Sequence, residues 1–431
     1  MRYLKRVESI VFYLTVFSII IQLGKHFWPK FSFVEGIRID YLSPTFYLSD
    51  FFIILLFVLV LLIRPARLFR DLSRTFILVF LFISILLSSF LAINQEAAFA
   101  ANLKILEMLF FGWYVSRFSF SLEKLTRLVD IILAAGFIQS VVAIVQFVLQ
   151  RSINGPLYYL GERSFNIDTI GIATFFANGR ELVRPYGTFP HPNVLAFFLS
   201  IVLILGTSMV LSRNKKIRQY LYTAVLLVTG TALMLTAART IILLTFTCIL
   251  FLFIRQKKLL FLTAPALILS LSIYFFIFSD RFMFDSLINA IRLRMDLFAA
   301  FVRIFADNLL LGVGTSNSFF YNTYLADLPI HIRFQPVHNI YLYILTQFGI
   351  LGSIPAGYFL YKSAARIIKT PNLFGKKKLF VLGVMLLFFE MLAVGFFDHF
   401  FVTLQQGGMI TSLILGMIWN KKLTEGFLQE G

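Results

Sequence analysis

Charged residues are scarce in this chain. Only 14% of its 431 residues are Asp, Glu, Lys or Arg, whereas 59% are hydrophobic. Soluble domains contain about 25% charged and roughly 45–50% apolar residues, so the composition excludes an ordinary soluble globular protein. Together with a mean hydropathy of +0.85, it predicts an all-α fold, a polytopic transmembrane helical bundle that contacts membrane lipids.

Cysteine is nearly absent as well, because Cys248 is the only one. A single cysteine excludes an intramolecular disulfide and a multi-cysteine metal site. The sequence has no DxD pair and no two histidines at ligand spacing, and outer carboxylates such as Asp280, Asp285 and Asp296 are scattered. We therefore expect neither a metal nor a cofactor.

The chain also lacks an internal repeat and any low-complexity tract. The inverted repeats common among secondary transporters are thereby disfavoured. Apolar runs long enough to cross about 30 Å of hydrocarbon recur along the whole length, so we expect one membrane domain over residues 1–431. About twelve spans are predicted, at 8–24, 47–63, 75–93, 97–116, 128–149, 191–211, 219–236, 238–254, 259–278, 338–361, 379–397 and 400–419.

The basic residues predict the orientation of these spans. Arg2, Lys5 and Arg6 precede the first apolar run, which ends without a small-residue cleavage pattern, so we interpret it as a retained span. With both termini cytoplasmic, most Lys and Arg residues fall on the inner side of a cytoplasmic membrane, as the positive-inside rule requires. Anionic inner-leaflet lipids then account for the net charge of +18, and no nucleic-acid partner is needed.

Two outer segments, 150–190 and 279–337, are too long to be simple turns, and we expect function there. The second contains an amphipathic helix with one polar stripe and one apolar face. The polar stripe consists of Asp285, Asn289, Arg292, Asp296, Arg303 and Asp307, and the apolar face of Leu287, Ile291, Phe298, Val302 and Phe305. Arg294 interrupts the apolar face, so it either snorkels or binds an anion beneath the helix.

The first outer segment ends in RPYGTFPHPN (184–193), directly before a predicted span. Asn193 is a good N-cap for that helix, whose free N–H groups would face outward. His338 and Asn339 lie at the corresponding end of another span. Two helix N-termini with partial positive charge are therefore expected at the same face, where they favour an anionic group.

Arg239 is expected at the tip of a tight outer turn, because residues 219–254 leave room for only two short spans around TAART (236–240). Arg184, Arg239, Arg294 and His338 then all map to the outer face. Guanidinium groups match the geometry of phosphate oxygens, so the set indicates a pyrophosphate site. The alternative is that the arginines are membrane anchors and that His338 is an interfacial hydrogen-bonding residue.

The later block, HNIYLYILTQFGILG, contains His338 and Asn339, then nine residues, Gly349, two residues and Gly352. With RPYGTFPHPN and LLGVGTSN (310–317), it resembles the O-antigen ligase and O-antigen polymerase superfamily of membrane glycosyltransferases.

The resemblance implies metal-independent transfer of a glycan from a polyprenyl pyrophosphate carrier to a glycan, lipid or protein acceptor, outside the cytoplasmic membrane. By resemblance, His338 is the catalytic residue that orients or deprotonates the acceptor hydroxyl, and Arg184, Arg239 and Arg294 bind the diphosphate. Asn339 caps and orients at the substrate site. Ligase and polymerase activities use the same donor chemistry, so both stay open.

Other residues have more than one interpretation. Lys104 and Glu107 are three residues apart in a span and are expected to pair. Asp398 and His399 either reach the site or cap a helix, and His191 either joins the site or fills a turn. Gly349 and Gly352 permit close helix packing or passage of a lipid tail. A flippase for lipid-linked glycans and a non-catalytic assembly subunit are the alternatives of other classes.

Overall fold

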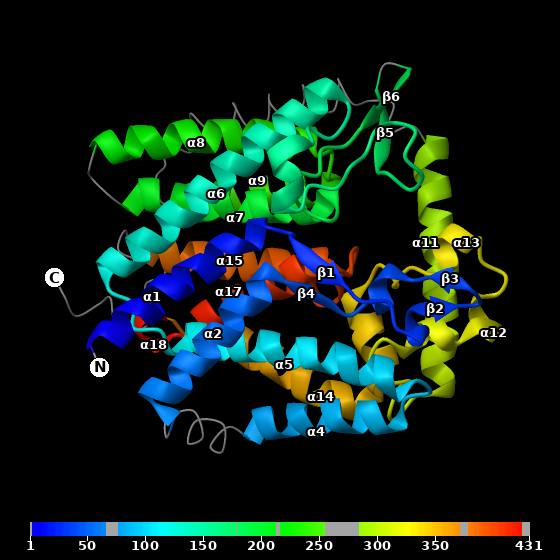
Figure 1. Cartoon of the computed structure of the whole chain (residues 1–431). Helices are drawn as coiled ribbons and strands as arrows, with labels where there is room; N and C mark the ends of the chain where they lie inside the picture. Colours follow the sequence, from blue (N-terminus) through cyan, green and yellow to red (C-terminus); the bar gives the residue numbers. More distant parts are fainter. Residues whose placement is uncertain are drawn as a thin grey trace.

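A computed structural model describes residues 2–65, 76–177, 179–212, 216–254, 284–370 and 378–424. The chain is a bundle of helices that run roughly in one direction, with short strands at one end (Figure 1). This arrangement follows from the long apolar runs, since a helix satisfies its own backbone hydrogen bonds where water is absent.

A helix lies in every predicted span within the described residues, whereas the predicted span 259–278 lies outside them. The helices of the bundle are α1 (Arg2–Phe17), α2 (Leu48–Ile63), α4 (Phe76–Leu91), α5 (Gln95–Arg117), α6 (Leu122–Leu149), α7 (Pro192–Ser212), α8 (Lys216–Leu235), α9 (Arg239–Phe253), α14 (Ile340–Ile368), α15 (Leu379–Val394) and α17 (Gln405–Ile418).

Four of the described helices, α5, α6, α7 and α14, are long and apolar enough to cross a membrane. Shorter apolar helices occur at Leu48–Ile63, Val79–Leu91, Arg239–Phe253 and Leu379–Val394. These findings confirm a mainly helical chain with several apolar helices, as a multi-pass membrane protein requires. The number of spans stays a prediction.

Helix α7 is the most deeply buried of the four, with 94% of its most apolar 18-residue window inside the protein. It packs against α6, α8, α9 and α15. At its centre the hydroxyl of Ser200 donates to the carboxylate of Glu390 at 2.7 and 2.9 Å, and Thr245 of α9 donates to the same group at 2.9 Å. Glu390, which has no evident partner in the sequence, is thus satisfied by two neighbouring helices.

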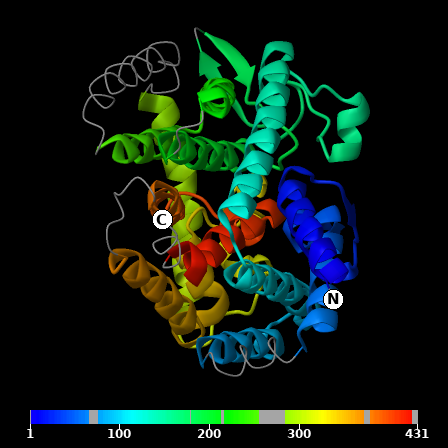
Figure 2. The same ribbon diagram turned by 90° about the vertical axis from the view of Figure 1, so that its left-hand side faces the viewer.

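A second helix, α17, lies in the middle of the other half of the bundle, with its closest packing against α5 (Figure 2). Gly416 allows this contact, because a Cβ there would lie 2.7 Å from the carbonyl oxygen of Gly112 in α5. Small residues bring helix backbones together where lipid supplies no hydrophobic driving force.

Irregular elements gather at the end of the bundle opposite the start of α1 (Figure 1). They include three antiparallel strand pairs, β1 (Gly24–His26) with β4 (Thr45–Tyr47), β2 (Phe33–Val34) with β3 (Ile37–Arg38), and β5 (Thr174–Ala177) with β6 (Arg180–Val183). The short helices α12 (Asn322–Leu325), α13 (Ile330–Arg333), α16 (Phe400–Thr403) and α18 (Lys421–Thr424) complete the described chain, α18 lying at the opposite end. We refer to the end with the strands as the loop end.

The predicted amphipathic helix is α11 (Phe284–Asp307), which lies across the bundle at the loop end (Figure 1). Its polar stripe is exposed at Arg292, Asp296, Arg303 and Asp307, as predicted. The predicted apolar face packs only partly against the rest of the protein. Ile291 and Val302 are 50% and 41% exposed, whereas the buried face consists of Leu297, Ala300, Phe301 and Ile304, with Phe298 and Phe305 at its edge.

The physical reason is that α11 packs on α14, α12 and α13, which turn its Leu297–Ile304 face inward. Because α11 carries hydrophobic residues on more than one face, the sequence pattern alone does not predict which face is buried. Leu287 belongs to the part whose side chains are outside the description.

Helix α14 is broken at Gly349, whose φ of 62° and ψ of −173° are not helical. The segment before Gly314 fills the break. Ile350 N–H donates to the carbonyl oxygen of Leu309 at 2.9 Å, and Val313 N–H donates to that of Thr346 at 2.9 Å. Backbone groups freed by a break in an apolar helix must find partners in the protein, and this segment supplies them.

The same segment is fixed on its other side by polar residues of the LLGVGTSN motif. The Thr315 hydroxyl donates to the Asn102 side chain at 2.7 Å, and the Asn317 side chain accepts the Asn94 N–H at 2.7 Å. The close packing predicted for the glycine pair is therefore confirmed at Gly349, where the partner is another loop rather than a helix.

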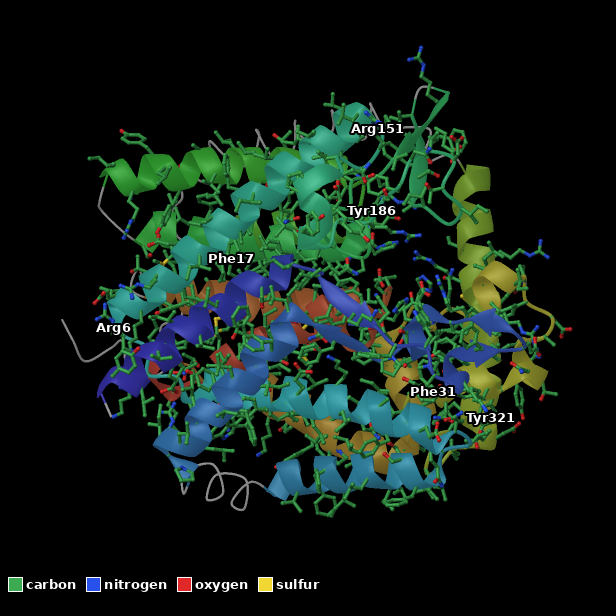
Figure 3. All side chains as sticks on the ribbon, viewed as in Figure 1. Arg6, Phe17, Phe31, Arg151, Tyr186 and Tyr321 are labelled. Atoms are coloured by element: carbon green, nitrogen blue, oxygen red, sulfur yellow. The ribbon has the colours of Figure 1, made fainter. Side chains whose placement is uncertain are left out.

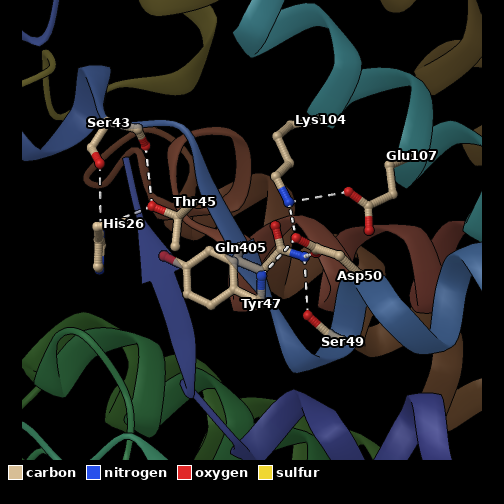
Figure 4. A network of polar contacts seen from close by, with 9 residues as sticks. All are labelled: His26, Ser43, Thr45, Tyr47, Ser49, Asp50, Lys104, Glu107 and Gln405. Carbon is tan, nitrogen blue, oxygen red and sulfur yellow. Dashed lines mark hydrogen bonds and ion pairs between the residues drawn. The ribbon is translucent and has the colours of Figure 1, made fainter. Parts of the chain in front are cut away.

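The Lys104 and Glu107 pair is also confirmed, at 3.2 Å. Figure 4 shows that Lys104 contacts Asp50 of α2 as well, and that Gln405 donates to Asp50 from the start of α17. The Asp50 carboxylate further accepts the backbone N–H of Tyr47 at 2.8 Å and so caps α2. Lys104 thus joins α5 to α2, and Gln405 adds α17 through the same Asp50 carboxylate.

Gly349→Ala is predicted to destabilise the protein severely. A Cβ at Gly349 would lie 2.4 Å from the carbonyl carbon and oxygen of Leu310, and an L side chain rarely adopts the positive φ. Gly357→Ala in the same helix is the control, since a Cβ there meets nothing within 4 Å. Thermal unfolding in detergent micelles should show a much lower melting temperature for Gly349→Ala and an almost unchanged one for Gly357→Ala. Equal melting temperatures would contradict the packing.

Candidate functional site

The RPYGTFPHPN loop is held in place by two glutamines of α6. Gln146 accepts the N–H groups of Tyr186 and Gly187 at 3.0 and 2.7 Å, and Gln139 accepts the Thr188 N–H at 3.0 Å. Both glutamines are 1% exposed. Because they lie seven residues apart, on one face of α6, they fix the loop along two turns of helix.

Arg184 is buried within this arrangement, with 6% of its surface exposed. Its Nε donates to the carbonyl oxygen of Thr236 at 2.6 Å, and its terminal nitrogen donates to the side chain of Asn193 at 2.7 Å. The guanidinium group thereby connects the first outer segment with the TAART turn.

The TAART turn is as tight as predicted, because α8 ends at Leu235 and α9 begins at Arg239. Ala237 has a φ of 52°, which is uncommon for a residue with a Cβ. Arg239 is half-buried at the first residue of α9, three residues from the Thr236 carbonyl that Arg184 contacts.

Asn193 joins Arg184 to Asp398. Its amide nitrogen donates to the Asp398 carboxylate at 2.6 Å, while its oxygen accepts from Arg184. The prediction that Asn193 is the N-cap of α7 is wrong. His191 takes that position, since its Nδ1 accepts the Asn193 N–H at 3.1 Å and its carbonyl accepts the Val194 N–H. The two prolines around His191 stiffen the approach so that the cap falls two residues earlier.

His338 lies beside His399 in an edge-to-face arrangement, with ring centroids 5.1 Å apart. His399 is buried, and its Nδ1 is 2.7 Å from the Thr403 hydroxyl. Among the described residues, no hydrogen-bond partner is found for the buried Nδ1 of His338. A half-buried imidazole with an unpaired nitrogen is the most reactive feature at the loop end.

Burial has the largest effect on the pKa values of these histidines. Burial lowers the pKa of His338 far below its usual ~6.5, and His399 and Arg294 lower it further. Burial also lowers the pKa of His191 to about 3 and that of His399 below its usual value. For Asp398, burial favours a raised pKa, but the neighbouring histidines and the hydrogen bond from Asn193 outweigh it, so the pKa is lowered.

Arg294 is exposed on α11 and lies close enough to lower the pKa of all three histidines. Its side chain therefore extends toward the histidine cluster. Side-chain nitrogen atoms are concentrated between the loop that carries Tyr186 and α11 (Figure 3). Positive charge from α11 thus lies near His338, and that of Arg184 lies near His191.

Asn339 is the N-cap of α14, because its side chain accepts the Leu342 N–H at 2.9 Å. The adjacent Ile340 N–H donates to the carbonyl oxygen of Gly395 at 2.8 Å. These bonds attach the His338 turn to the last turn before Asp398. A role for Asn339 in substrate binding stays a prediction, and its cap position already explains its orientation.

The structure brings together His338, Arg184, Asn193, Arg294 and Asp398 from four separate segments. Sequence reasoning left open the roles of Asp398, His399 and His191, and it missed Gln139 and Gln146. The glutamines did carry a signal, since two amides seven residues apart in an otherwise apolar span need partners. Such a site can neutralise an anion with guanidinium groups and accept a proton at an imidazole nitrogen.

Comparison with known families adds an independent finding. Residues 223–356 match the family model described as O-antigen ligase. The match includes Arg239, Arg294, His338 and Asn339, and it confirms the resemblance seen in the sequence motifs. It supports a glycosyltransferase-like membrane protein that acts in surface polysaccharide assembly. A search of the curated proteins finds no match.

Asn193→Ala is predicted to lower the free energy of unfolding by roughly 2–4 kcal/mol, because two buried charges each lose a hydrogen bond. Asn166→Ala, on an exposed turn of the same outer segment, is the matched control and should cost less than about 1 kcal/mol. Chemical unfolding in detergent micelles measures both. If the two variants are equally stable, Asn193 does not join Arg184 to Asp398.

Proposed function

From the O-antigen ligase match at residues 223–356, we propose that this membrane protein transfers a glycan from a polyprenyl pyrophosphate carrier to an acceptor hydroxyl. The observation that carries the proposal is the half-buried His338 with its unpaired Nδ1, close enough to Arg294 for that guanidinium group to lower its pKa. Arg184 lies near the neighbouring His191, whose pKa it lowers. We assign the loop end to the extracytoplasmic face of the cytoplasmic membrane, in agreement with the distribution of Lys and Arg.

In the proposed reaction, the acceptor hydroxyl oxygen attacks the anomeric carbon of the sugar bound to the diphosphate. A new carbon–oxygen bond forms, and the bond from the anomeric carbon to the phosphate oxygen breaks. The polyprenyl diphosphate leaves with the electron pair, while the neutral imidazole of His338 accepts the proton of the hydroxyl.

The arginines stabilise the leaving group. Charge develops on the diphosphate as the bond breaks, and guanidinium groups fixed beforehand stabilise that charge without reorganisation. Arg184 is the best fixed of the three, through Thr236 and Asn193, whereas Arg294 reaches in from α11. Arg239 begins α9 beside the same turn and is assigned the same ligand. We propose that these cations act in place of a metal.

Ligase and polymerase are the two candidate activities, and they differ in the acceptor. A lipid core or protein acceptor would define a ligase, and a second lipid-linked glycan a polymerase. The ligase is our first choice, because the matched family model is described as O-antigen ligase. A flippase would place charged residues along a path through the membrane, whereas the arginines here gather at the loop end.

His338→Ala is predicted to abolish carrier release. Without the imidazole, no group at this position accepts the proton, and general base catalysis typically contributes 10²–10⁴-fold. The assay uses purified protein in lipid vesicles with a polyprenyl pyrophosphate oligosaccharide, and it measures free carrier and glycan size. A ladder of lipid-linked glycans would identify a polymerase, and a single shift of an added acceptor a ligase.

The control is His26→Ala, which removes an exposed histidine of the same end of the bundle outside the cluster. It should retain carrier release. Release by both wild type and His338→Ala would refute the catalytic role of His338. No release by wild type, across several donors and acceptors, would favour transport or assembly.

The pH dependence supplies a further prediction. Because the pKa of His338 is lowered in the free enzyme, the acid limb of kcat/KM should lie below pH ~6.5. A bound diphosphate adds negative charge and raises that pKa, so the acid limb of kcat should lie at higher pH. Rate measurements between pH 4 and 8 test this order. Coincident limbs would contradict a contact between His338 and an anionic ligand.

A further inference from the structure

The segment between α1 and α2, residues 24–47, has no part in the mechanism so far. Its buried residues Val34, Ile39 and Leu42 form a small hydrophobic cluster with Phe319 and Phe334. Glu35 and Arg333 form an ion pair at 2.9 Å, which ties the β2–β3 turn to α13. The segment is thus fixed against the region that follows α11.

Tyr41 is the residue of this segment that reaches the histidine cluster. Its ring stacks on Phe319, with centroids 6.1 Å apart and an interplanar angle of 11°. It meets the ring of His399 edge to face at 5.6 Å, and His399 in turn contacts His338 at 5.1 Å. Two aromatic neighbours therefore define the plane and position of the phenol.

The hydroxyl of Tyr41 has no hydrogen bond within the described part of the chain, and it is not fully enclosed by the protein. Most tyrosine hydroxyls that are partly buried find a partner. Burial, followed by the nearby Asp398, raises the pKa of Tyr41, so the phenol stays protonated at neutral pH. It is a fixed hydrogen-bond donor and acceptor without a partner.

We propose that Tyr41 contacts the substrate, with its hydroxyl bonded to a hydroxyl of the sugar ring next to the diphosphate. The charges that act on Tyr41 come first from Asp398 and then from Asp40, which repel an anion, so this position favours a sugar hydroxyl over a phosphate. A phenol that both donates and accepts suits a sugar hydroxyl. The inference rests on the proposed function, since it takes the same donor as ligand.

Tyr41→Phe tests the contact, because it keeps the ring against Phe319 and His399 and removes only the hydroxyl. We expect kcat/KM for carrier release from the polyprenyl pyrophosphate oligosaccharide to fall roughly three- to tenfold, the usual effect of one hydrogen bond. Tyr324→Phe is the matched control. Its hydroxyl also lies at the loop end but bonds Asp307, away from the histidines, and its loss should leave the rate unchanged.

A second measurement separates sugar from phosphate. Polyprenyl pyrophosphate without sugar should raise the melting temperature of wild type and Tyr41→Phe equally, whereas the glycan-bearing donor should stabilise wild type more. If Tyr41→Phe loses the same amount of thermal stabilisation with both ligands, the assignment to the sugar is wrong. Unchanged kcat/KM in Tyr41→Phe would overturn the contact altogether.

These results distinguish failure of the contact from failure of the proposed function. If wild type releases no carrier but is stabilised by the donor more than Tyr41→Phe is, the transfer reaction is wrong and the Tyr41 contact stands. If the donor stabilises neither protein and none is turned over, both proposals are wrong.

Discussion

The hydrogen bonds that run from Arg184 through Asn193 to Asp398 determine the geometry of the loop end. They connect the segment before α7 with the turn before α16, and Arg184 adds the TAART turn through the Thr236 carbonyl. Each bond involves a charged group that is at least nine-tenths buried. Bonds of this kind are expensive to break, because a buried charge then remains without a partner. Three turns far apart in sequence are therefore held in one arrangement.

The position of His338 depends on a separate structural feature, the break in helix α14. Asn339 begins the helix and the Ile340 N–H attaches it to Gly395, while the segment up to Gly314 fills the break at Gly349. Residues 310–317 are in turn bonded to α4 and α5 through Thr315 and Asn317. Glycines are thus required at this break because two backbones approach each other closely there. The packing fixes the half of α14 that follows His338.

Local sequence patterns predicted local features well. The apolar runs, the Lys104–Glu107 pair, the TAART turn and the Asn339 cap each depend on residues a few positions apart, and the structure has them. The partners of Asp398, Gln139 and Gln146 lie tens to hundreds of residues away, so no spacing rule could reveal them. The buried face of α11 is likewise set by the helices that pack on it. The α7 cap is a different case, because the prolines that shift it are adjacent to His191 in the sequence.

The contrast between Glu390 and His338 bears on where a ligand is expected. Glu390, inside the bundle, has both oxygens bonded by Ser200, with Thr245 as a second donor, so its polar capacity is met by the protein. Around Asp398, by contrast, the Nδ1 of His338 is left without a bond among the described residues. An unpaired buried polar atom costs about 1–3 kcal/mol. An acceptor hydroxyl bound at His338, which lies near Arg294, would remove that cost.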